Sequence, residues 1–90
     1  MVVLALFTLQ NSGTKMAKHY VTFGQVHTHM VNGKTLDCNT VAVFEAESYE
    51  DGRGKAFKYF GDKFFTDYHD SEWDESKLIF YPKGYVFLWL

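Results

Sequence analysis

Hydrophobic and polar residues alternate most regularly over residues 19–46, a stretch rich in Val, Thr, Phe and Tyr that is interrupted by Asn32-Gly33. Alternation with a period of two is typical of half-buried strands. Asn-Gly favours a two-residue type I′ turn, because both central residues need positive φ. The pattern therefore predicts one long β-hairpin over 19–46, with a register that places Val21 opposite Phe44.

This register gathers the more apolar side chains on one face of the hairpin, which we expect to be the core face. Its members are Val21, Phe23, Leu36, Cys38, Ala42, Phe44 and Ala46. His27 and His29 point to the same face, near the turn, because residues two apart on a strand share a face.

Residues 49–60 carry the signals of a helix. Ser48 is a favourable N-cap and Gly61 a favourable C-terminal stop. Gly52 and Gly54 each cost about 1 kcal/mol of helix propensity relative to alanine. We therefore expect both glycines to allow close approach of the helix to the sheet or to a ligand.

Three apolar segments after the helix predict strands, and an acidic segment between them predicts a loop. The strands span 63–69, 77–81 and 85–90, and the loop spans 70–76. The predicted fold class is α+β: an antiparallel β-sheet, made of the hairpin 19–46 and two or three further strands, with one helix at about 49–60 packed on one face.

The last segment, YVFLWL at 85–90, is apolar on both faces. Such a strand is either central in its sheet or an edge that pairs with another copy of the chain. An exposed edge this hydrophobic would be an association site, so a homo-oligomer is one expectation.

The length of 90 residues predicts one domain, 1–90, and the aromatic content of 19% predicts a packed core rather than a disordered chain. The formal charge of −2 lacks the basic excess of proteins that neutralise phosphates, so we do not expect direct nucleic-acid binding. The single cysteine, Cys38, cannot form an intramolecular disulfide, which favours a reducing compartment.

Residues 1–15 begin with a short apolar run that is not preceded by Lys or Arg. A membrane span needs about 20 apolar residues, so we expect no membrane insertion. Two interpretations stay open. The run is either an extra strand, Val2–Thr8, or part of a non-native extension ahead of a natural start at Met16.

The histidines of the hairpin raise the question of a metal site. In the predicted register His27 faces Cys38, with His29 two residues along on the same face and His69 as a fourth candidate. Imidazole and thiolate ligands suit zinc. The motif is not specific, however, so structural histidines are the main interpretation. No catalytic constellation is evident, and we expect no cofactor.

The acidic segment offers a candidate surface for binding a protein partner. Carboxylates speed the capture of basic partners, and aromatic side chains anchor interfaces. The candidate partner-binding residues are Tyr68, Asp70, Glu72, Trp73 and Asp74.

A second set of residues offers donors for a small nucleotide. Its members are His27, His29, Arg53 and Lys55. This set is the alternative to a protein-binding surface, and a metal-dependent hydrolase built on the histidines ranks below both.

Four motifs resemble small accessory proteins encoded by bacteriophages. They are FGQVHTHMVNGK, VAVFEAESY, GRGKAFKYFGDKF and YPKG, and the likeness covers residues 19–85. The resemblance implies a non-enzymatic binding protein in the bacterial host cytoplasm that inhibits or redirects a host protein. Anti-CRISPR and other anti-defence proteins belong to this general class. The resemblance carries no catalytic or binding residue over to this chain.

Overall fold

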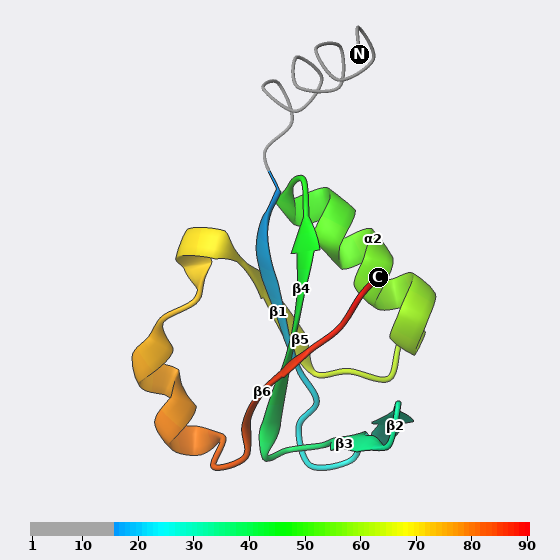
Figure 1. The fold of residues 1–90 in the computed structure, drawn as a ribbon, viewed down its shortest axis with the longest axis vertical. Coiled ribbons are helices and arrows are strands. Elements are labelled where there is room, and N and C mark those ends of the chain that lie inside the picture. Colours follow the sequence, from blue (N-terminus) through cyan, green and yellow to red (C-terminus); the bar gives the residue numbers. More distant parts are fainter. Residues whose placement is uncertain (1–15) are drawn as a thin grey trace, which may run out of the picture.

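The computed structural model describes residues 16–90, and its centre is a four-stranded sheet with the strand order β5-β1-β4-β6 (Figure 1). The strands are β1 (Ala17–Thr22), β4 (Thr40–Ala46), β5 (Thr66–His69) and β6 (Gly84–Phe87). β1 runs antiparallel to both of its neighbours, and β6 runs parallel to β4. The predicted α+β class is confirmed, although the sheet is mixed rather than antiparallel throughout.

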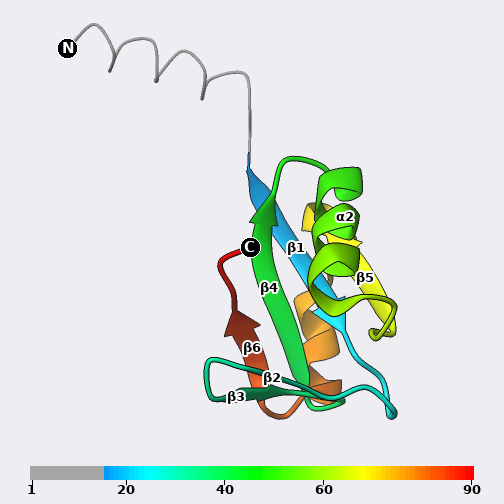
Figure 2. The same cartoon turned by 90° about the vertical axis from the view of Figure 1, so that its right-hand side faces the viewer.

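The predicted hairpin is divided into two ladders. Its tip forms a separate two-stranded sheet of β2 (His29–Val31) and β3 (Lys34–Leu36), joined by Asn32 and Gly33 at φ 52° and 79°. The tip keeps the predicted register. It is turned across the direction of the main strands in both Figure 1 and Figure 2.

The ladder between β1 and β4 has a different register from the predicted one. Val21 pairs with Ala42 instead of Phe44, an offset of two residues. Thr22 pairs with Val41 and His29 pairs with Leu36, so the six residues 23–28 lie opposite the four residues 37–40, and the two extra residues in 23–28 account for the offset. On the shorter side the chain turns at Asp37–Thr40, where the Thr40 N–H donates to the Asp37 carbonyl over 3.1 Å. Because side chains alternate with a period of two, an even offset leaves the predicted face unchanged.

The helix α2 (Tyr49–Phe60) forms as predicted and covers one face of the sheet (Figure 2). The Ser48 hydroxyl accepts from the Asp51 N–H, and Gly61 ends the helix at φ 67°. The main core lies between this helix and the sheet. Its buried members are Val21, Phe23, Val31, Leu36, Ala42, Phe44, Ala56, Phe60 and Val86.

The opposite face of the sheet is covered by residues 70–80, which form two short 3-10 helices, η1 (Asp70–Glu72) and η2 (Glu75–Phe80). The predicted strand at 77–81 is therefore wrong, and the acidic segment is more ordered than a loop. Beneath it lies a second core of Val41, Val43 and Trp73 with several half-buried tyrosines. The predicted strand at 63–69 is shortened to β5, and the one at 85–90 becomes β6, which begins one residue earlier and ends at Phe87.

The parallel placement of β6 follows from the path of residues 70–83. Parallel neighbours need a connection that crosses a face of the sheet, whereas antiparallel neighbours need only a tight turn. From β5 the chain crosses the outer face through η1 and η2 and reaches the far edge, beside β4 (Figure 1). The predicted strand or extension within 1–15 lies outside the described residues.

Candidate functional site

A buried polar network joins β1, β5 and α2 around His19, whose side chain is fully buried. The His19 Nε2 lies 2.7 Å from the Asp67 Oδ2, and its Nδ1 lies 3.0 Å from the His69 Nδ1. The Arg53 Nη1 donates to the Asp67 Oδ1 over 2.8 Å and to the Tyr49 hydroxyl over 2.6 Å. Both oxygens of the buried carboxylate are therefore occupied.

The protonation of this network follows from its charges. Asp67 and Arg53 already balance one another, so a proton on His19 would add an uncompensated buried charge. Burial lowers the pKa of His19, against the raising effect of its hydrogen bond to Asp67. The neutral ring donates from Nε2 to the carboxylate, so its Nδ1 accepts from the Nδ1–H of His69.

Every buried side-chain nitrogen and oxygen in residues 16–90 has a hydrogen-bond partner. Closed networks of this kind rigidify a fold and specify how its elements meet. Neither His19 nor Asp67 was singled out from the sequence as a site residue. Their signal is nonlocal, because the pair meets only through the β1–β5 register that opposes His19 to His69.

The predicted partner-binding residues lie at the end of β5 and on η1 and its neighbours. Asp70, Glu72 and Asp74 are exposed, and Tyr68 is half-buried. Trp73 requires a correction, because it is only 7% exposed. Its ring stacks on Tyr20 and its Nε1–H donates to the Tyr85 hydroxyl over 2.9 Å, so it supports the second core instead of anchoring a partner.

The exposed apolar residues of this surface are Ile79 and Phe80, whereas Trp73 is buried. Ile79 and Phe80 are 80% and 72% exposed at the end of η2. The sequence assigned them to a strand, in which neighbouring side chains alternate between faces. In the 3-10 helix both are exposed, while Leu78 packs against the second core.

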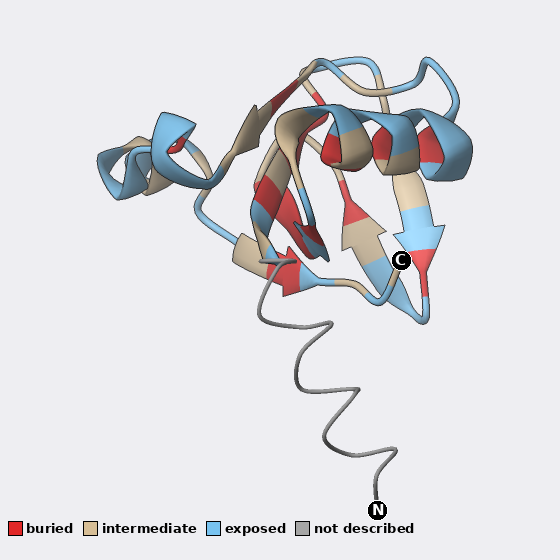
Figure 3. Ribbon diagram, turned by 90° about the horizontal axis from the view of Figure 1, so that it is seen from above, coloured by how far each residue is buried: buried red, intermediate tan, exposed pale blue. Residues whose placement is uncertain are grey.

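We call the exposed outer side of residues 70–80 the acidic ridge. It projects from the sheet and is coloured as exposed along most of its outer side in Figure 3. The segment contains four carboxylates and one lysine, which leaves a local charge of −3. The ridge therefore combines negative charge with two exposed apolar side chains. Its exposed members are Asp70, Ser71, Glu72, Asp74, Glu75, Ser76, Ile79 and Phe80.

The residues considered as an alternative metal site, His27, His29, Cys38 and His69, do not come together in the part of the chain that the structure describes. Among residues 16–90, no three His, Cys, Asp or Glu side chains are grouped closely enough to hold a metal ion. His27 lies between β1 and β2 and has no ladder partner, so it does not face Cys38. The His29 Nε2–H donates to the Lys63 carbonyl over 2.7 Å, and His69 is bonded to His19.

The four candidate nucleotide-binding residues lie in separate places. His29 packs against Phe60 at the end of α2, whereas Arg53 lies about 10 Å earlier along the helix at 1.5 Å per residue. Arg53 points to Asp67 on β5, and Lys55 points to the Glu45 carbonyl on β4. Arg53 and Lys55 thus point to opposite sides of the helix, and the four donors do not converge on one ligand.

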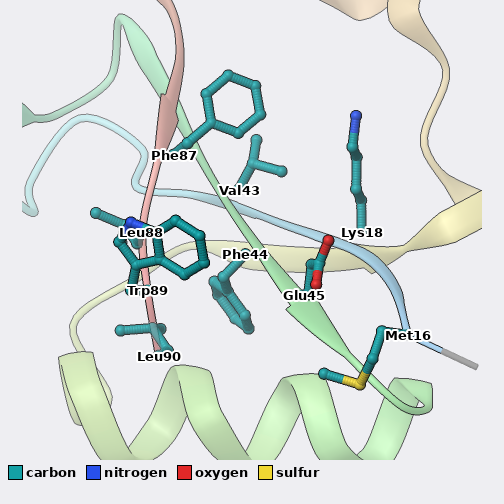
Figure 4. Close-up of a pocket in the computed structure, with 9 residues that line it drawn as sticks. All are labelled: Met16, Lys18, Val43, Phe44, Glu45, Phe87, Leu88, Trp89 and Leu90. Carbon is teal, nitrogen blue, oxygen red and sulfur yellow. The ribbon is translucent and has the colours of Figure 1, made fainter. Parts of the chain in front are cut away.

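A groove of about 370 Å³ lies where β1, β4 and the C-terminal residues meet (Figure 4). Its walls are mainly apolar, and Lys18 and Glu45 contribute its two charges. Two of its lining side chains are largely exposed, Phe87 at 60% and Trp89 at 99%. The lining residues are Met16, Lys18, Val43, Phe44, Glu45, Phe87, Leu88, Trp89 and Leu90.

A second concavity of about 550 Å³ lies beside His69. Its charged lining residues are Lys18, Glu47 and Asp70, in addition to the imidazole. Charges of both signs line it, so its composition selects neither anions nor cations.

Comparisons with known protein families, with curated proteins and with solved structures found no match to this chain. Within the described residues, the helices are too short or too polar to cross a membrane.

Proposed function

We propose that this protein is a non-enzymatic binding protein that inhibits or redirects a protein of a bacterial host, of the kind that bacteriophages direct against host enzymes or defence systems. The observation that carries the proposal is the acidic ridge, in which four carboxylates and the exposed side chains of Ile79 and Phe80 belong to one segment of the chain. The sequence resemblance to phage accessory proteins supplies the host cytoplasm as its place of action.

The ridge has the two properties that a docking surface needs. Its negative charge favours encounter with a basic partner surface, since opposite charges accelerate association at moderate salt. Its apolar end supplies area that gains free energy on burial, at about 25 cal/mol per Å². Because the second core supports the ridge from beneath, little conformational entropy is lost when a partner binds.

The test neutralises the ridge without changing its shape. In a variant with Asp70→Asn, Glu72→Gln and Asp74→Asn, the 70 position keeps a residue that tolerates its φ of 45°, and the 74 position keeps a residue able to cap η2. The matched control neutralises three exposed carboxylates elsewhere, with Glu47→Gln, Glu50→Gln and Asp62→Asn.

All three proteins are used to capture partners from bacterial lysate at a series of salt concentrations. We expect a host protein that the wild type and the control retain and that the ridge variant loses, with recovery that falls as salt rises. Equal recovery by the ridge variant and the control would remove the ridge as the docking surface. Matching denaturation midpoints establish that each variant is folded.

A further inference from the structure

The outer edge of β6 carries unpaired backbone groups. β6 is the last strand of the sheet, and within residues 16–90 it pairs only with β4. The ladder continues beyond the strand, because the Leu88 N–H donates to the Val43 carbonyl over 2.8 Å. Backbone groups of successive strand residues point to alternate sides, so Tyr85, Phe87 and Trp89 direct theirs away from β4.

Both faces of this edge are apolar. On the helix side Val86 and Leu88 belong to the main core or pack against it. On the outer side Phe87 and Trp89 are mostly exposed. Edge strands of monomers usually carry charged residues, proline or bulges that block further pairing. The run from Tyr85 to Leu90 has none of these features.

We propose that a second copy of this chain pairs with this edge, so that β6 and its copy run antiparallel about a two-fold axis at Phe87. In this register Phe87 meets the partner's Phe87, and Tyr85 meets the partner's Trp89. The three outward-facing residues of each copy form three hydrogen-bonded pairs with two backbone bonds in each. The two sheets then become one sheet of eight strands, four from each copy.

The register is self-complementary in its side chains as well as in its backbone. On the outer face it builds a ladder of aromatic pairs, one of the kinds of cross-strand pair that stabilise sheets. On the helix face Val86 meets the partner's Leu88, so apolar residues oppose each other there too. A strand from a different protein would need apolar side chains on both of its faces to match this edge. A second copy of the chain has them, because its β6 has the same sequence.

Charge and area agree with a second copy. Lys18 and Glu45 are cross-strand partners at the rim of the adjacent groove, so the surface carries one charge of each sign. These two charges balance within each copy, so no excess of one sign repels a second copy. Full coverage of Phe87 and Trp89 on both copies would remove roughly 500–800 Å² of surface, from 150–250 Å² per aromatic ring and exposed fractions of 60% and 99%. That is about half of the roughly 1,200 Å² at which stable interfaces begin, and the paired backbone edges add to it.

The experiment uses the position that meets itself across the axis. Phe87→Glu and Phe87→Lys each place like charges opposite one another, so each variant of the full chain should sediment as a monomer. An equal mixture of the two should regain the wild-type dimer, because the heterodimer places glutamate opposite lysine. Val26→Glu, at an exposed apolar residue in the loop before β2, is the matched control and should stay dimeric.

Sedimentation velocity over a wide concentration range gives the oligomeric state, and amide hydrogen exchange reports on the edge. The amides of Phe87 and Trp89 should exchange more slowly as the fraction of protein in the dimer rises with concentration. A wild type that stays monomeric at every concentration overturns the proposal. So does a dimer that survives both single substitutions, or edge amides protected in the monomer, which would mean that another segment of the same chain covers the edge.

Discussion

His19 is buried beneath α2 and uses both ring nitrogens, one toward Asp67 and one toward His69. The helix can approach this ring because its nearest residue, Gly52, has no side chain. A Cβ built at position 52 would overlap the ring atoms of His19, whereas one built at Gly54 meets nothing within 4 Å. The expected close approach of α2 thus holds for one of the two glycines only.

Alanine at these two positions should have opposite effects on stability. Gly52→Ala forces the ring or the helix to move and should lower the free energy of unfolding by about 1–3 kcal/mol, the usual cost of overpacking. Gly54→Ala should raise it by up to about 1 kcal/mol through helix propensity. Urea denaturation measures both. Equal effects of the two substitutions would show that His19 does not hold the helix at this distance.

The same histidine predicts how stability depends on pH. Burial lowers the pKa of His19 from its ordinary value of 6.5, so the unfolded chain takes up this proton at higher pH than the folded chain. The contribution is fully present above pH 6.5 and is lost as pH falls from there through the lower pKa of the folded state. Of the groups that face His19, Asp67 and Glu72 raise its pKa and His69 lowers it, and the effect of burial is the largest.

Denaturation midpoints measured between about pH 8 and pH 5 should therefore decrease toward the acid end. Ring nitrogen shifts in NMR spectra should show His19 still neutral where an exposed histidine is half protonated. Asp51 and Asp74 have pKa values below the ordinary 3.8, so the stability they contribute is lost only at pH values more acidic than this range. A constant midpoint over the whole range would show that His19 is not buried as a neutral ring.

Among the elements, η2 is a 3-10 helix where the sequence predicted a strand, and this difference decides which of its apolar side chains are exposed. A strand over 77–81 would place Leu78 and Phe80 on one face, because residues two apart share a face. The 3-10 helix instead packs Leu78 against the second core and leaves Phe80 exposed. Sequence periodicity could not separate these cases, since the apolar run is too short to show a helical or a strand period.

Truncation of these two side chains should therefore differ in effect. Leu78→Ala should cost about 1–2 kcal/mol, below the usual range for a fully buried leucine because this one is half-buried. Phe80→Ala should change the free energy of unfolding by no more than about 0.5 kcal/mol, as is usual at exposed positions. Urea denaturation of the two variants gives the comparison. Similar losses would indicate that both residues share one buried face, as in a strand.

At the scale of the whole molecule, the sheet is covered on both faces, by α2 on one side and by residues 70–80 on the other (Figure 1). The two proposed contacts use different parts of this assembly, the outer side of the acidic ridge and the outer edge of β6. Two of the experiments belong to this scale, because each tests how the folded molecule binds another one. They are the capture of a host protein with the ridge variant and the sedimentation of Phe87→Glu mixed with Phe87→Lys.

Local signals in the sequence determined the turn at Asn32-Gly33, both ends of α2 and which hairpin side chains, such as Val21, Ala42 and Phe44, face the main core. Each of these depends on neighbouring residues and on a period of two or 3.6, which the chain carries in its order alone. The tertiary structure decided that Trp73 is buried, that His19 meets Asp67, and that β6 lies parallel to β4 as the last strand of the sheet formed by residues 16–90. These contacts join residues far apart in the chain, so they depend on how the covering segments cross the sheet.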